Sequence, residues 1–251
     1  MGTDLHYRHE LKYYITTAEY MELVPRVRAV LDRDPHIGES GRYLIRSIYF
    51  DNYFDKALRE KLDGVCVREK FRIRWYNDDF STLKLEKKMK NHSLCLKYSA
   101  RLTEDECYRI LRNETDWMKQ QKNELIQELA LKEDSQLLRP KVMVSYLREP
   151  YIYSPGNVRI TFDSDIRTSM YHPFGEEILA PDISALTEQG MVMEVKYDAY
   201  LPEIIAALLQ IGKIRQTAFS KYGICRRFGE KRFGTMTRTD EMNEGDSNYD
   251  I

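Results

Sequence analysis

A run of alternating charge between residues 67 and 76 places the strongest constraint on how this chain can fold. Read with the period of a β-strand, it places cations on one face and mainly apolar side chains on the other. The cations of that face are Arg68, Lys70, Arg72 and Arg74. Because like charges in neighbouring positions destabilise a strand, we expect an anion opposite them. The alternatives are a solvated face, or pairing with carboxylates of adjacent strands.

The same two-faced pattern recurs in other segments that we predict to be strands. These segments are 7–15, 83–89, 94–102, 158–163 and 192–197. Residues 43–51 are predicted to be a strand buried on both sides, with Arg46 as its one cation. Residues 142–153 are predicted to form a hairpin with 158–163. Amphipathic helices are expected between the strands, at 17–31, 104–112, 117–132, 202–212 and 217–227. Thr16 with Glu19, and Thr103 with Glu106, form capping boxes that open the first two helices.

Composition excludes several classes of protein. The net charge of the 251-residue chain is −1, which argues against nucleic acid as a partner. The four cysteines are scattered without metal-ligand or redox spacing. The N-terminal segment lacks the apolar core of a signal peptide, and the longest apolar stretch is too short to cross a bilayer. We therefore expect a soluble, cytoplasmic protein without a membrane segment of its own.

The apolar strand faces need a cover, and the helices are the elements available to supply it. That arrangement predicts an α+β fold in which an antiparallel β-barrel or tunnel carries helices on its outside and charge in its lumen. The cations expected to line the lumen are Arg8, Lys12, Arg46, Arg68, Lys70, Arg72, Arg74, Lys84, Lys88, Lys97 and Arg159. Desolvated cations repel one another unless an anion compensates them, and phosphates accept charge-assisted hydrogen bonds from arginine and lysine. We therefore predict a polyphosphate or nucleotide ligand.

Six short motifs, taken in order, resemble those of a known family. The motifs are Arg8-x-Glu10-x-Lys12-Tyr13, Ser47-Ile48-Tyr49-Phe50-Asp51-Asn52, Arg72-x-Arg74-Trp75-Tyr76, Glu86-Lys87-Lys88, Glu194-Val195-Lys196 and Ser220-Lys221-Tyr222. Together they resemble the catalytic domain of the vacuolar transporter chaperone (VTC) family, a branch of the triphosphate tunnel metalloenzymes. The resemblance spans about residues 7–229, which we take as one domain, and leaves an acidic tail at 230–251 that we expect to be disordered.

The resemblance implies an ATP-dependent polyphosphate polymerase that transfers the γ-phosphate of ATP to a growing chain of inorganic polyphosphate. It implies catalytic roles for Lys12, Arg72, Arg74, Lys88 and Glu194. Phosphate or ATP contacts are expected from Arg8, Arg46, Lys70, Lys84, Lys97, Arg159, Lys196 and Lys221. Glu194 would hold the divalent metal cofactor, Mn²⁺ or Mg²⁺. Glu10 and Glu86 are interpreted as internal counter-ions, and Tyr49 as a packing residue.

The first motif departs from the hydrolytic branch of the superfamily. That branch begins with an E-x-E-x-K strand, and Arg8 stands here at the position of its first glutamate. This difference favours the polymerase over an inorganic triphosphatase. A non-catalytic polyphosphate-binding protein is the remaining alternative, although Glu194 argues for a metal. Larger family members also carry a sensor domain and transmembrane helices, so regulation and export by this chain would depend on other proteins, including a membrane-protein partner.

Overall fold

Strand pairing joins the charged segments into one antiparallel sheet. The computed structural model describes residues 8–35, 37–38, 40–92, 94–169, 183–186, 190–210 and 214–228. Eight strands lie side by side in the order β1-β10-β8-β7-β3-β4-β5-β6, and the short β2 and β9 pair with β7 and β8. The strands are β1 (His9–Thr16), β2 (Asp32–Arg33), β3 (Tyr43–Asp51), β4 (Val67–Tyr76), β5 (Asp79–Asn91), β6 (Leu94–Arg101), β7 (Arg139–Tyr153), β8 (Val158–Ser169), β9 (Ile183–Ser184) and β10 (Gly190–Tyr197).

The sheet curls so that its two edge strands, β1 and β6, approach each other. An isolated bridge joins Arg8, just before β1, to Cys95 of β6. An ion pair joins Glu10 of β1 to Lys88 of β5, two strands that lie far apart in the strand order. Among the described residues β1 and β6 do not form a continuous ladder. The predicted α+β class and antiparallel sheet are confirmed, but hydrogen bonding does not close the barrel.

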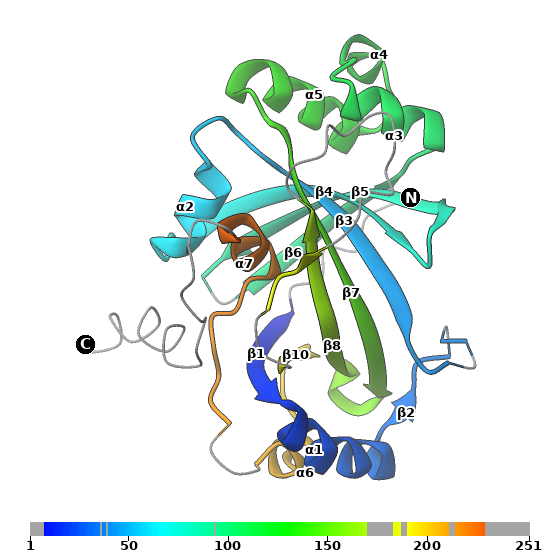
Figure 1. Ribbon diagram of the computed structural model, residues 1–251, viewed down its shortest axis with the longest axis vertical. Coiled ribbons are helices and arrows are strands. Elements are labelled where there is room, and N and C mark those ends of the chain that lie inside the picture. The colour runs from blue at the N-terminus through cyan, green and yellow to red at the C-terminus, as the bar shows by residue number, and fades with distance from the viewer. Residues whose placement is uncertain are drawn as a thin grey trace.

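Helices cover the convex face of the sheet in two groups (Figure 1). The first group covers β3 to β6 and consists of α3 (Glu104–Leu111), α4 (Asp116–Lys119) and α5 (Glu124–Gln136). Its core is built around the fully buried Trp75 and Ile73 of β4. The second group covers β1, β10, β8 and β7 and consists of α1 (Thr17–Val30) and α6 (Glu203–Leu208). The opposite, concave face of the strands is hereafter called the inner face.

One helix packs on the inner face, where the sequence predicted only charge. Helix α7 (Lys221–Arg227) joins α2 (Lys56–Leu62) in a core with Tyr49 of β3 and Tyr146 of β7. Figure 1 shows α7 inside the curve of the sheet, beside α2. The Tyr222 hydroxyl donates to the Asp51 carboxylate at 2.5 Å. Asp51 also accepts from two backbone amides at the start of α2, at 2.9 and 3.1 Å. This one carboxylate therefore links β3, α2 and α7.

Three helix predictions need correction, and the first is the helix expected at 202–212, which is the shorter α6 (Glu203–Leu208). Both capping boxes are present as predicted, at Thr16 and Thr103. The expected helix at 117–132 is instead two helices, because the Asn123 side chain accepts a hydrogen bond from the Leu125 amide and starts α5 anew. The helix expected from residue 217 begins at Lys221, where the Ser220 side chain caps it.

Two further predictions concern the end of the chain and membranes. The expected acidic tail, 230–251, lies outside the described residues. Within the described part of the chain, no helix combines the length and apolarity needed to cross a bilayer. The remaining element is a short 3-10 helix, η1 (Pro155–Asn157), which joins β7 to β8.

Candidate phosphate-binding site

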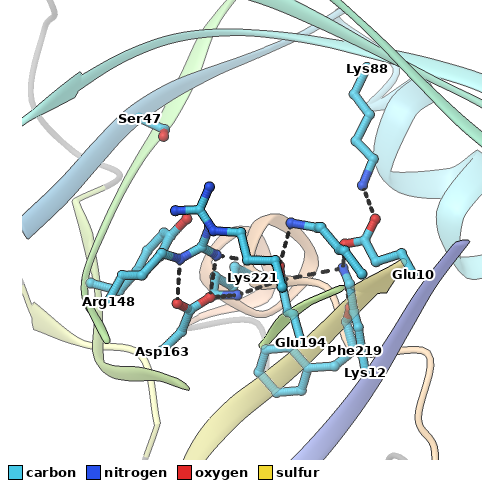
Figure 2. Close-up of polar contacts among 12 residues, drawn as sticks. Glu10, Lys12, Ser47, Lys88, Arg148, Asp163, Glu194, Phe219 and Lys221 are labelled. Atoms are coloured by element: carbon cyan, nitrogen blue, oxygen red, sulfur yellow. Dashed lines mark hydrogen bonds and ion pairs between the residues drawn. The ribbon is translucent and has the colours of Figure 1, made fainter. Parts of the chain in front are cut away.

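Charged side chains from five elements converge inside the curled sheet. Figure 2 shows Glu194 among cations contributed by β1, β7 and α7. Its carboxylate lies 2.8 Å from Lys221, 3.1 Å from Lys196, 3.3 Å from Arg148 and 3.8 Å from Lys12. Burial alone would raise the pKa of Glu194, but these four cations hold the pKa well below the usual carboxyl value. Glu194 is therefore ionised, and its negative charge helps to offset the positive charges of the four side chains around it.

A second buried carboxylate lies beside Glu194. Asp163 of β8 accepts two hydrogen bonds from the guanidinium of Arg148, at 2.7 and 2.6 Å. Lys221 bridges the two acids, 2.6 Å from Asp163 and 2.8 Å from Glu194. The Lys221 amine also lies 4.8 Å from the centre of the Tyr146 ring. Because both acids share the same cations, any anion that enters here competes with Asp163 and Glu194 for them.

The arginines of β4 have a carboxylate of their own. Arg72 contacts Glu86 of β5 at 2.6 Å and also donates to the Tyr49 hydroxyl at 2.9 Å. Arg74 is buried and donates to the Ser47 hydroxyl and the Tyr146 hydroxyl, each at 3.0 Å. Glu86 is 2% exposed, and the neighbouring arginines outweigh its burial and lower its pKa. Glu86 therefore occupies the role of internal counter-ion.

Glu10 is likewise an internal counter-ion, for the lysines of β1 and β5. Its carboxylate forms an ion pair with Lys88 and lies 3.4 Å from Lys12. Burial opposes ionisation, but these lysines hold the pKa of Glu10 well below its usual value. Lys12 also donates to the Phe219 carbonyl at 3.3 Å (Figure 2). The chain thus neutralises much of its own inner-face charge.

The other cations of the predicted site differ in where they lie. Lys97 is exposed, and its amine lies 3.1 Å from the Glu86 carboxylate. Lys84 of β5 lies opposite Arg74 of β4. Arg159 shares the inner face with Lys196 and pairs with Asp34 at 2.7 Å.

Two cations of the predicted site form ion pairs at a strand end or on the outer side of the sheet. Arg8 pairs with Asp198 at 2.9 Å, just beyond the end of β10. Arg46 is a correction, because it lies opposite Trp75 on the outer side of β3 and pairs with Asp78 at 2.6 Å. As expected for a lone arginine in an apolar strand, Arg46 has an anion beside it, and that anion is an aspartate of the chain.

Sequence reasoning passed over Arg148 and Asp163. Both lie in strands that were predicted, and Arg148 is also a lone cation in an apolar run. Like Arg46, Arg148 needs an anion nearby because its neighbours in the strand are apolar, and this signal was present in the sequence. Arg148 has the parity of Val144 and Tyr146, which lie in the inner core, so the alternation of β7 places it on the inner face. The extra residue of the register shift opposite Ser145 and Leu147 lies in β8.

In the described interior, too few carboxylates lie close together to hold a divalent cation without other ligands. Among the described residues, no group of three aspartate, glutamate, histidine or cysteine side chains lies close enough to hold a metal. The oxygens of Glu194 are already paired with cations. Mg²⁺ is commonly held by one or two carboxylates together with substrate phosphates. A metal bound here would therefore take most of its ligands from substrate phosphates.

Tyr49 and Lys70 are unusual among the inner-face groups. Burial raises the pKa of Tyr49, but Arg72 and other cations outweigh burial and bring it to about 7. Burial lowers the pKa of Lys70, Tyr49 opposes that shift, and nearby cations add to it, so that the pKa falls to about 7. The Lys70 amine lies 5.4 Å from the centre of the Tyr49 ring. Tyr49 is thus part of the electrostatics of the site as well as of its packing.

We expect the stability of the ligand-free protein to rise with pH above about 7. Lysine in an unfolded chain titrates at about 10.4, so between these values the unfolded state binds more protons than the folded state. Under that condition the free energy of unfolding increases with pH. Lys70→Met should flatten the increase, as measured by urea unfolding at several pH values. A variant with the same pH dependence as the parent would show that Lys70 is not the depressed group.

Comparison with known proteins gives one family and several distant likenesses in fold. A solved structure of a protein from Pyrococcus horikoshii OT3 is 15% identical, covers 87% of this chain and 97% of its own, and has a TM-score of 0.45. A Bacillus halodurans protein provisionally named an adenylate cyclase is 15% identical, with 83% and 88% covered and a TM-score of 0.48. A Vibrio parahaemolyticus protein, provisionally named in the same way, is 10% identical, with 81% and 83% covered and a TM-score of 0.42.

The other two comparisons differ in outcome. No curated protein matches the chain. The family model described as the VTC domain matches residues 7–228, which is nearly the whole chain.

Proposed function

The chain belongs to the VTC domain family, and from this membership we propose that it is a polyphosphate polymerase that uses ATP as phosphoryl donor. The observation that carries the proposal is the convergence of arginine and lysine side chains from β1, β4, β5, β7, β10 and α7 on one interior. Arginine forks and lysine amines match the oxygens of a chain of phosphates. A single small anion would not need so many cations.

The proposed reaction forms one phosphoanhydride bond and breaks another. An oxygen of the terminal phosphate of the acceptor chain attacks the γ-phosphorus of ATP, the bond from that phosphorus to the β-phosphate oxygen breaks, and ADP leaves. Such a transfer depends on alignment and charge neutralisation rather than on a protein nucleophile. In this proposal Arg72, Arg74 and Lys88 hold phosphates from one wall, and Lys12 and Lys221 hold them from the other. A divalent metal, when bound, would neutralise charge on phosphate oxygens, with Glu194 as its protein ligand.

The internal carboxylates give these cations a second role. In the ligand-free protein, Glu10, Glu86, Asp163 and Glu194 take the places of anions around the interior. An incoming triphosphate would therefore exchange these ion pairs for phosphate contacts instead of filling an uncompensated cationic space. This exchange moderates affinity, which suits a site that must release its product.

A second candidate function is binding of polyphosphate without turnover. The observation that favours it is the full pairing of Glu194 with cations, which a counter-ion needs and a metal ligand does not. The inorganic triphosphatase is less well supported, because Arg8 replaces the first acidic position of the hydrolytic branch and pairs here with Asp198.

Incubation with ATP and Mn²⁺ or Mg²⁺ separates these functions. A polymerase yields long polyphosphate, resolved on gels, and ADP. A triphosphatase yields free phosphate from inorganic triphosphate without longer products, and a binder yields neither. Long-chain product would support the proposed function, and its absence under every metal condition would contradict it.

Ligand-dependent stability gives a prediction that does not depend on turnover. Inorganic triphosphate should raise the melting temperature at low salt, because an anion bound only by the native state stabilises it by mass action. At 100 times the Kd the expected gain is about 2.7 kcal/mol. The effect should shrink as salt screens the charges. A melting temperature that does not respond to triphosphate at low salt would rule out the interior as an anion site.

A further inference from the structure

The inner face of β4 and β5 continues beyond the carboxylate-paired cations just described. Arg68 lies directly opposite Lys90, and Lys70 lies directly opposite Lys88. These positions share the face of Arg72, because strand residues two apart point the same way. From Arg72 to Arg68 is four residues, or about 13 Å along the strand. The pair of Arg68 and Lys90, hereafter the distal pair, therefore extends the basic face past the arginines of the proposed triphosphate site.

The cations of the proposed triphosphate site, hereafter the central cations, are paired with carboxylates of the described chain, and the distal pair is not. Arg72, Lys88 and Lys221 each form an ion pair with a carboxylate. Within the described chain, neither Arg68 nor Lys90 forms an ion pair with a carboxylate. Arg68 instead donates to the Val65 carbonyl at 2.5 Å.

The electrostatics of the distal pair agree with this geometry. Partial burial lowers the pKa of Arg68. Partial burial also lowers the pKa of Lys90, and the charge of Arg68 lowers it further. Lys70, which lies between this pair and the central cations, likewise forms no ion pair with a carboxylate of the described chain. Arg68 and Lys90, two neighbouring cations on one half-buried face, thus lack an ion-paired carboxylate within the described chain, and an external anion would relieve their repulsion.

We propose that the distal pair binds the phosphates of a polyphosphate chain that lie beyond the first three, so that the site prefers long linear polyphosphate over triphosphate. This inference rests on the proposed function and deepens it. A linear chain lying along β4 and β5 would meet the central cations first, then Lys70, and then Arg68 and Lys90. A triphosphate held by the central cations would not reach the distal pair.

The test compares two ligands on one set of variants. Binding of inorganic triphosphate and of long-chain polyphosphate is measured by calorimetry for the parent, Lys90→Ala and the double variant Arg68→Ala/Lys90→Ala. Lys122→Ala, which removes an exposed lysine elsewhere, is the matched control. We expect the double variant to bind long-chain polyphosphate at least about tenfold more weakly and with a weaker dependence on salt, because fewer phosphate contacts release fewer counter-ions. Triphosphate affinity should change by less than about threefold, since the paired central cations remain.

Each outcome decides the matter. An equal loss for both ligands would place the distal pair within the triphosphate site and overturn the inference, and so would unchanged binding of both. A parent protein that binds neither ligand would overturn the proposed function together with the inference. Removing two cations that repel each other should not weaken the fold, so the melting temperature of the ligand-free double variant is expected to equal or exceed that of the parent.

Discussion

Replacing Glu194 with glutamine is expected to reduce polyphosphate synthesis by about 100-fold or more, a loss of the size seen when one preorganised electrostatic group is removed. Triphosphate affinity should be kept or increased, because the four cations around Glu194 lose a competing anion. A loss confined to the catalytic step would mark Glu194 as a residue that acts on the transferring phosphate. Turnover is measured as long-chain product, and affinity by calorimetry.

Glu194→Gln is also expected to change the thermal stability of the protein. Without ligand, Glu194→Gln should melt at a lower temperature than the parent, because Lys221 and its neighbours lose a counter-ion. Triphosphate should restore more stability to the variant than to the parent. Glu22→Gln, at an exposed position of α1, is the control; it should match the parent in synthesis and affinity, and lose at most about 0.3–0.5 kcal/mol, the contribution of an exposed helix pair. Near-normal synthesis by Glu194→Gln would remove the assignment of Glu194 as metal ligand.

Replacing Arg148 with alanine is expected to lower the free energy of unfolding by about 3 kcal/mol. Removing one partner of a buried ion pair typically costs about 3–5 kcal/mol. The lower end applies because Lys221 remains 2.6 Å from Asp163 and partly compensates it. Asp163 is fully buried, so the charge left behind cannot be hydrated without disrupting β8. Urea unfolding of the ligand-free proteins measures the difference.

An exposed arginine provides the comparison for Arg148. Arg26 pairs with Glu22 at 2.8 Å on the surface of α1, and both side chains are about half exposed. Arg26→Ala should cost about 0.3–0.5 kcal/mol, as exposed helix pairs do. If Arg148→Ala cost no more than Arg26→Ala, the buried network would not be a determinant of stability. The double variant Arg148→Ala/Asp163→Ala should recover part of the loss, since it removes the unpaired charge.

Periodicity was the reliable guide to the sheet. A strand has a side-chain period of two, so the alternation in residues 67–76 assigned each residue to a face before any partner was known. Trp75 lies in the outer core and Arg74 on the inner face, as that alternation requires. The capping boxes at Thr16 and Thr103 were equally readable, because a cap depends on residues only three positions apart.

Alternation became unreliable where a strand was apolar on both sides. In β3 it gave no reason to prefer one face for Arg46, which lies on the outer side. In β8 the register shift opposite Ser145 and Leu147 reverses the alternation, so that Asp163 and Ile166 both lie on the inner side. The position of α7 was also beyond local pattern, because its place on the inner face depends on Tyr222 reaching Asp51 across 171 residues.

The sequence by itself determined which residues carry charge, which strand face carries that charge, and that an anion must compensate it. Only the tertiary structure decided which anions do so without a ligand. Glu10 meets Lys88 because the sheet curls, and Glu194 meets Lys221 because α7 folds onto the inner face. Ion pairs of this kind depend on distance in space and not on distance along the chain, since Coulomb energy falls with separation regardless of connectivity. Arg68 and Lys90 lie beyond the reach of those carboxylates, and that too is a consequence of the curl and not of any local motif.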